Sequence, residues 1–132
     1  MQPFHLGHIA LRTPNLEKSI AFYGLLGAKV LYREKLVRGE NITDIALLQL
    51  SDFRIELSHR RGGTVQPATH EQNWSHLCIE TDDVDKLTAQ LKALGVDTFA
   101  ADAPADMELF GGIRNINLSG PSGETIELSQ NR

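Results

Sequence analysis

An internal repeat covers nearly all of the 132-residue chain and constrains its fold more than any other feature. The segment Gly-His-Ile-Ala-Leu at 7–11 parallels Ser-His-Leu-Cys-Ile at 75–79, and Ile-Glu-Leu-Ser occurs at both 55–58 and 126–129. The offset between the copies is nearly the same at both ends, and the small difference fits in a loop. Two copies predict a pseudo-symmetric pair of modules, because a solenoid usually needs three or more repeats.

Each half of the repeat contains one amphipathic helix, expected at about residues 15–26 and 84–94. Apolar side chains recur at helical spacing in both segments. Each helix follows a capping residue and ends at a glycine. The capping candidates are Asn15 and Asp82 or Asp83, and the terminal glycines are Gly27 and Gly95.

Strand-like segments surround both helices and give each half the order strand, helix, three strands. The expected strands are residues 4–11, 28–33, 42–50 and 53–58 in the first half, and 76–80, 96–99, 112–118 and 124–129 in the second. The segments 59–74 and 100–112 are rich in polar and chain-breaking residues, so we expect irregular structure there. Loops of this length often carry function.

Composition excludes several classes of function. The formal net charge is -4 and the pI about 5.7, which argues against a nucleic-acid partner. No apolar run approaches the roughly 20 residues of a membrane span, and the first residues lack the pattern of a signal peptide. We therefore expect a cytoplasmic protein. The single cysteine, Cys78, lies in an apolar run and is interpreted as a small buried side chain, not a nucleophile.

The repeated histidine and glutamate are the residues that point to chemistry. Strand side chains alternate between faces, so Glu56 lies opposite its apolar neighbours, and Glu127 does the same. If each module curls into half a barrel, His8 and Glu56 point into one concavity, and His76 and Glu127 likewise. Two imidazoles and two carboxylates suit Zn, Ni, Co, Mn or Fe(II). Taken singly, each residue is more often a surface side chain; the duplication favours a metal site.

Six segments, spread over nearly the whole chain, resemble the sequence of a known family. They are 7–11, 16–23, 26–30, 55–57, 75–80 and 120–128. Together they resemble the vicinal-oxygen-chelate superfamily, also called the glyoxalase, bleomycin-resistance and extradiol-dioxygenase fold. The last segment resembles the family's DPDG-x-x-IEL signature, with Gly-Pro-Ser-Gly in place of Asp-Pro-Asp-Gly.

The resemblance implies an α+β fold in which two tandem βαβββ modules form a curved mixed sheet or half-barrel around a metal site. The predicted organisation is a single domain over 1–132. Module one lies at about 4–58, the linker at 59–74 and module two at about 75–129. The family also implies a homodimer, in which the site forms within one chain or across the interface.

The complete set of four ligands is similar to that of glyoxalase I. It implies a metal-dependent lyase or isomerase, with one divalent metal per site, that acts on a small molecule with vicinal oxygens. The substrate would be a hemithioacetal or a related compound, and the reaction would pass through an enediolate. The resemblance implies Glu127 and Glu56 as the catalytic pair but does not say which of them is the base.

Three alternatives stay open on the same fold. The related methylmalonyl-CoA epimerases tend to have Gln at the position of Glu56. Extradiol dioxygenases use Fe(II) with two histidines and one carboxylate. A drug- or metabolite-binding module usually lacks the ligands.

A few positions outside the repeat bear on the substrate. Arg12 matches a glutathione-contacting arginine of glyoxalase I, and a solvated strand-end arginine is an equal interpretation. Arg60 and the segment 106–110 depart from the glutathione pattern, which leaves another thiol adduct, a CoA ester or a hydroxy-carbonyl acid open. Trp74 and Phe110 are candidates for the pocket lining or for packing. The remaining histidines, His5, His59 and His70, are interpreted as surface or loop residues.

Overall fold

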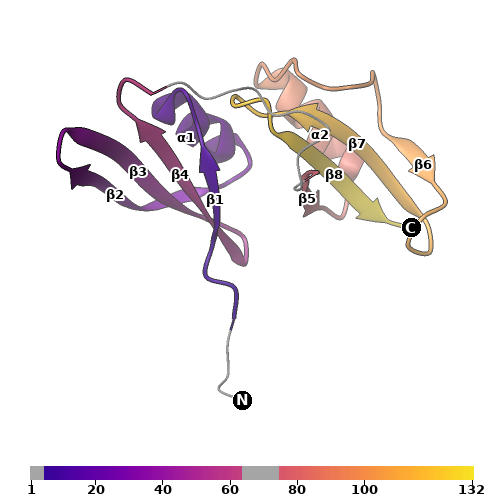
Figure 1. The fold of residues 1–132 in the computed structure, drawn as a ribbon. Coiled ribbons are helices and arrows are strands. Elements are labelled where there is room, and N and C mark those ends of the chain that lie inside the picture. The colour runs from indigo at the N-terminus through magenta and orange to yellow at the C-terminus, as the bar shows by residue number, and fades with distance from the viewer. Residues whose placement is uncertain (1–4, 64–74) are drawn as a thin grey trace. The chain divides into compact units, whose positions relative to one another are not determined.

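The computed structural model describes residues 5–63 and 75–132. The chain divides into two compact units, residues 1–66 and 67–132, called unit 1 and unit 2 below (Figure 1). Both have the order strand, helix, three strands. The predicted duplication of a βαβββ module is therefore confirmed.

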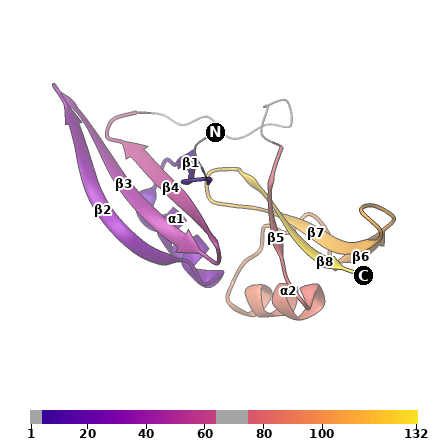
Figure 2. The ribbon, with the colours of Figure 1, turned by 90° about the horizontal axis from the view of Figure 1, so that it is seen from below.

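Unit 1 is a four-stranded mixed sheet with one helix. Its elements are β1 (Ile9–Arg12), α1 (Leu16–Leu25), β2 (Lys29–Arg38), β3 (Asn41–Leu50) and β4 (Phe53–Arg60). The strand order is β1-β4-β3-β2, in which β1 runs parallel to β4 and the other pairs are antiparallel. Figure 2 shows β2, β3 and β4 side by side as a twisted ribbon.

Unit 2 repeats this topology. Its elements are β5 (Leu77–Glu80), α2 (Val84–Ala93), β6 (Ala105–Met107), β7 (Ile113–Ser119) and β8 (Thr125–Asn131). The strand order is β5-β8-β7-β6, again with the first strand parallel to the last. The α+β class predicted from the sequence is confirmed in both units. In the described part of the chain, no helix is long and apolar enough to cross a membrane.

The core of each unit lies between its helix and one face of its sheet. In unit 1, α1 packs on β3 and β4, and Ile55 and Leu57 are buried there. In unit 2, α2 packs on β7 and β8, and Ile126 and Leu128 are buried. Burying such a side chain contributes roughly 1.5–3 kcal/mol. Strand side chains alternate between the two faces of a sheet. Glu56, between Ile55 and Leu57, and Glu127, between Ile126 and Leu128, therefore point to the face that the helix does not cover.

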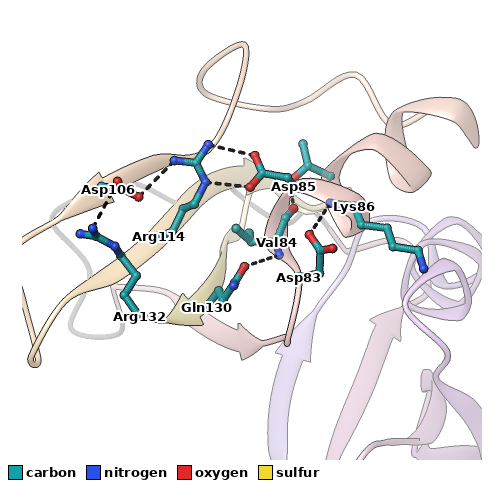
Figure 3. Close-up of polar contacts among 9 residues, drawn as sticks. Asp83, Val84, Asp85, Lys86, Asp106, Arg114, Gln130 and Arg132 are labelled. Carbon is teal, nitrogen blue, oxygen red and sulfur yellow. Dashed lines mark hydrogen bonds and ion pairs between the residues drawn. The ribbon is translucent and has the colours of Figure 1, made fainter.

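The helix ends follow the predicted capping. The Asn15 side chain accepts a hydrogen bond of 3.1 Å from the Lys18 amide, and Asp83 accepts one of 3.0 Å from Lys86 (Figure 3). The cap of α2 is thus Asp83 and not Asp82. Both helices are followed by a glycine with positive φ, Gly27 at 94° and Gly95 at 95°, a conformation that favours glycine.

The predicted strand at 96–99 is wrong. Only Phe99 forms an isolated bridge, to Leu118 of β7. The edge strand of unit 2 is instead β6, inside the segment 100–112 that was expected to be irregular. The segment 96–99 is short, and the alanine- and aspartate-rich residues that follow it have low strand propensity. In unit 1 the strand after the helix, β2, instead continues through ten residues.

Several boundaries also differ from the sequence-based expectation. β1 begins only at Ile9, β2 extends beyond 33 to Arg38, and β4 runs to Arg60. The expected linker start at residue 59 is therefore too early. His59 is not a loop residue: it is half-buried in β4 and its Nδ1 hydrogen-bonds the Thr13 carbonyl at 3.0 Å. His5 is exposed outside any element, and His70 and Trp74 lie outside the described residues.

Candidate metal centre

In unit 1, His8 and Glu56 lie on the sheet face that α1 does not cover. Ala10 is the Cα partner of Glu56 across the parallel strands β1 and β4. His8 is two residues before Ala10, so in extended chain its side chain points to the same side. The Nε2 atom of His8 is 3.9 Å from Oε1 of Glu56, and the side chains are 46% and 31% exposed. We call this side of each sheet the ligand face.

The same relationship recurs in unit 2 with a shorter distance. Cys78 is the Cα partner of Glu127, and His76 is two residues before it. The Nε2 atom of His76 is 3.1 Å from Oε1 of Glu127. The Glu127 side chain is only 14% exposed. The predicted pairing of one histidine with one glutamate is thus present within each unit.

Two further side chains hold the pair in unit 2. The Ser75 hydroxyl is hydrogen-bonded to Nδ1 of His76 at 2.8 Å, which leaves Nε2 directed to Glu127. The Asn115 amide donates a hydrogen bond of 2.7 Å to Oε2 of Glu127. Such supporting contacts orient metal ligands in proteins. Unit 1 has Gly7 and Ile45 at the corresponding positions, so neither contact is repeated there.

The two pairs fit a divalent metal in chemistry and, in unit 2, in spacing. Ligand atoms about 2.1 Å from a common ion lie roughly 3 Å apart, close to the distance between His76 and Glu127. The separation of His8 and Glu56 is wider, at 3.9 Å, and both side chains are partly exposed. Within residues 5–63 and 75–132, no three His, Cys, Asp or Glu side chains form a metal cluster. Each unit presents one His–Glu pair, and the four-ligand metal site stays a prediction.

Arg12 lies on the ligand face of unit 1. It is the Cα partner of Ser58, two residues along the strands from the pair Ala10 and Glu56, and so on the same face. Its side chain is exposed and has no hydrogen bond or ion pair within the described residues. A guanidinium without an internal partner is available to an anionic group of a ligand. The substrate role predicted for Arg12 remains a proposal.

The sequence analysis missed Asn115. The repeat contained a signal for it: the alternation in 113–118 places Asn115 and Asn117 on the polar side of a strand, whereas the corresponding residues of unit 1 are Ile45 and Leu47. Comparison of the two copies beyond their shared residues would have identified it.

The prediction that Cys78 is buried is wrong. Cys78 is exposed, because β5 is an edge strand and the thiol lies on the ligand face. Partial burial and the nearby Glu127 carboxylate raise the pKa of the Cys78 thiol to about 11. A thiol with this pKa stays protonated at neutral pH and is a poor nucleophile. Phe110, another candidate for the pocket, is 85% exposed.

A separate set of ion pairs in unit 2 involves residues of α2, β6 and β7 (Figure 3). The Arg114 guanidinium binds both carboxylate oxygens of Asp85, at 2.8 and 3.0 Å, and Asp106 at 3.1 Å. Arg132 approaches Asp106 at 3.6 Å. Arg114 is the Cα partner of Gln130, which bonds the first turn of α2, so these pairs lie on the helix side and not on the ligand face.

Comparison with known proteins relates the chain to a large superfamily. The model of the Glyoxalase/Bleomycin resistance protein/Dioxygenase superfamily matches residues 5–128. The human mitochondrial methylmalonyl-CoA epimerase is 32% identical over 93 residues, which are 66% of this chain and 52% of that protein. The chain thus spans about half the length of the curated relatives it matches.

Solved structures share the fold. The fosfomycin resistance protein FosX from Listeria monocytogenes, in complex with Mn(II) and sulfate, has a TM-score of 0.71 and 19% identity over 99% of this chain and 95% of that one. A glyoxalase I variant from Zea mays has a TM-score of 0.75 and 23% identity, over 92% of this chain and 43% of that one. At these identities the likeness establishes the fold alone.

Proposed function

Because the chain belongs to the glyoxalase/bleomycin resistance protein/dioxygenase superfamily, we propose that it is a metal-dependent enzyme that moves a proton at a carbon next to a carbonyl. The first candidate reaction is that of a glyoxalase-I-type lyase or isomerase on a hemithioacetal or related substrate. The observation that supports this most is the His–Glu pair on the ligand face of each unit, at matching positions.

The proposed metal ligands are His8, Glu56, His76 and Glu127, two from each unit. The units would come from one chain or from the two chains of a homodimer. Two carboxylates balance the charge of a divalent ion, so such a site avoids an unpaired buried charge. Zn, Ni, Co, Mn and Fe all accept these ligands, and the Mn(II) in the FosX complex makes Mn(II) the first to test. When bound, the metal is a Lewis acid that offsets negative charge developing on the substrate oxygens.

The side chains of this chain would supply the proton transfer and the substrate contact. One carboxylate of the glutamate pair would take the proton from the substrate carbon and return it to a neighbouring or the same carbon. Arg12, on the ligand face and without an internal partner, would bind an anionic group of the substrate.

A second candidate substrate class is an acyl-CoA thioester. The curated relatives at 30–32% identity are methylmalonyl-CoA epimerases, and an epimerase also removes and returns a proton next to a carbonyl. The two candidates differ in the substrate and not in the type of proton transfer. The same Mn(II)-loaded protein can therefore test both.

The experiment compares Mn(II)-loaded protein on a hemithioacetal and on a methylmalonyl thioester in deuterium oxide. Proton transfer predicts metal-dependent turnover of one substrate, with deuterium entering the product at the reacting carbon. Turnover of the hemithioacetal supports the lyase, and turnover of the thioester supports the epimerase. Metal binding with oxygen consumption on a catechol would instead indicate a dioxygenase. Protein that binds small molecules without metal would contradict the proposal and indicate a binding module.

A further inference from the structure

We propose that three arginines on the ligand face of unit 1 bind a phosphate-bearing part of the substrate, such as the nucleotide end of an acyl-CoA thioester. These residues, called the arginine patch below, are Arg12, Arg38 and Arg60. The proposal rests on the proposed function, because it takes the ligand to be the substrate, and it deepens that function by naming the substrate class. The patch lies wholly within unit 1.

Strand register brings Arg12 and Arg60 to the same end of the ligand face. Arg12 on β1 is the Cα partner of Ser58, and Arg60 is two residues further along β4. Residues two apart on a strand point to the same face. Arg12 and Arg60 are therefore diagonal neighbours on adjacent strands, with the Ser58 hydroxyl between their backbones.

A side-chain contact directs Arg60 toward Arg38. One guanidinium nitrogen of Arg60 donates a hydrogen bond of 2.8 Å to the side-chain oxygen of Asn41 on β3. Asn41 is the Cα partner of Arg38 on β2, and β2, β3 and β4 lie side by side (Figure 2). Like charges that approach across strands destabilise a sheet. An anion bound between the two guanidinium groups would offset this repulsion.

Acidic side chains neutralise the arginines on the helix side of unit 1 but not those of the patch. On the helix side, Arg33 pairs with Glu17, and Arg61 pairs with Asp44. Among the residues that the structure describes, no carboxylate lies within ion-pair distance of the patch. The patch therefore keeps its positive charge for a ligand.

The second copy of the module shows that the fold does not require these cations. The counterpart of Arg12 in unit 2 is Glu80, the Cα partner of Ser129. The counterpart of Arg60 is Asn131. Unit 1 contains nine Lys and Arg against six Asp and Glu, whereas unit 2 contains four against eleven. The arginine patch is thus a property of unit 1 and not of the repeated module.

The donors of the patch suit phosphate better than carboxylate. A guanidinium binds a phosphate through two parallel N–H groups, and three guanidinium groups offer more donors than one carboxylate accepts. Ser58 and Thr43, the Cα partners of Arg12 and Arg60, add two hydroxyl groups. An acyl-CoA thioester carries several phosphates, whereas a hemithioacetal of glutathione carries only carboxylates.

The patch lies at a distance from the candidate reaction centre. Arg60 is four residues after Glu56 on β4, which is about 13 Å along an extended strand. The patch would therefore hold a part of the substrate that does not react. The phosphates of an acyl-CoA are separated from the thioester by the pantetheine arm, as this placement requires.

The first test measures binding to the metal-free protein by calorimetry, with coenzyme A and pantetheine as probes. Pantetheine is the matched probe, because it has the thiol arm of coenzyme A without the phosphates. We expect coenzyme A to bind at least about 10-fold more tightly, since hydrogen bonds between charged groups contribute at least that much. Its Kd should rise with salt concentration. Glutathione should bind no more tightly than pantetheine.

The second test uses variants of the patch. We expect Arg60→Gln and Arg38→Gln each to raise the Kd for coenzyme A by about 10-fold or more and to leave the Kd for pantetheine unchanged. Arg54→Gln is the matched control, because it removes the same charge from the same face of β4, outside the patch, where the guanidinium bonds Gln49. All three positions are exposed, so the melting temperatures should stay close to that of wild type. An equal loss of coenzyme A affinity in Arg54→Gln and Arg60→Gln would indicate unspecific charge attraction and overturn the proposal.

The outcomes separate the patch from the proposed function. A wild-type protein that binds coenzyme A no more tightly than pantetheine would overturn the patch, and turnover of the hemithioacetal by the same protein would leave the proposed proton transfer standing. A protein that binds coenzyme A through its phosphates and turns over neither substrate with Mn(II) would overturn the proposed function and leave the phosphate site standing.

Discussion

Cys78 is the Cα partner of Glu127 across the parallel strands β5 and β8, in the position that Ala10 occupies beside Glu56 in unit 1. The two copies therefore place a small side chain next to each candidate ligand. A thiol whose pKa is raised to about 11 offers little thiolate at neutral pH. Its position beside Glu127 thus does not make it a catalytic nucleophile.

Replacement of Cys78 by alanine should leave the protein intact. We expect Cys78→Ala to change the free energy of unfolding by no more than about 0.5 kcal/mol, as for most exposed positions. We also expect the variant to retain Mn(II) binding, because the corresponding residue beside Glu56 in unit 1 is already an alanine, Ala10. Denaturant unfolding and metal titration check this. Loss of turnover with full metal occupancy would show that the thiol takes part in the chemistry.

The buried face of unit 2 should determine much of its stability. Leu128 is fully buried on the helix side of β8. We expect Leu128→Ala to lower the free energy of unfolding by about 2–5 kcal/mol through lost burial and the cavity that remains. Leu109→Ala, at a side chain that is 45% exposed, is the control and should have little effect. Equal effects in urea unfolding would contradict the packing described for unit 2.

The ion pair between Asp85 and Arg114 predicts a pH-dependent contribution to stability. Arg114 lowers the pKa of the Asp85 carboxyl below its ordinary value. A folded-state pKa below the unfolded value means that the contribution is present above about pH 4 and is lost as the pH falls through the folded pKa. Asp85→Asn should therefore lower the melting temperature at pH 7 and leave it unchanged near pH 2. Asp97→Asn, at an exposed residue of the loop after α2, is the control. A difference from wild type that is the same at both pH values would exclude the ion pair as its cause.

Arg12 should affect binding of the substrate more than its conversion. We expect Arg12→Ala to raise KM by about 10-fold or more, because hydrogen bonds to charged groups contribute roughly 1.5–3 kcal/mol, and to change kcat little. Arg54→Ala is a matched control, because the Arg54 guanidinium already bonds Gln49 at 3.0 Å. An unchanged KM in Arg12→Ala would instead support the interpretation of Arg12 as a solvated arginine at the end of a strand.

The repeat predicted most of the fold because it fixed the same order of elements twice. The helix caps at Asn15 and Asp83 and the strands that carry Glu56 and Glu127 follow from local patterns. The edge strand of unit 2 could not be placed, because its position depends on which part of β7 the chain reaches after a long loop. β-propensity in 96–99 alone does not determine this pairing.

The candidate site was predictable only in part. The His and Glu residues stood out because both copies retain them. The sequence also shows that Asn115 corresponds to Ile45 in the other copy, but its contact with Glu127 became visible only when the strand register placed the two residues diagonal to each other. Hydrogen bonds between side chains on different strands require this register, which the sequence pattern does not fix to a single residue.

The metal content of the purified protein tests the central claim most directly. Elemental analysis of wild type, His8→Ala and His76→Ala, each saturated with Mn(II) and then passed through a desalting column, measures bound metal per chain. Four ligands drawn equally from the two copies predict about one metal ion per chain in wild type and a large loss in each variant. A wild-type protein without metal, or a His8→Ala protein that keeps as much metal as wild type, would contradict the shared site.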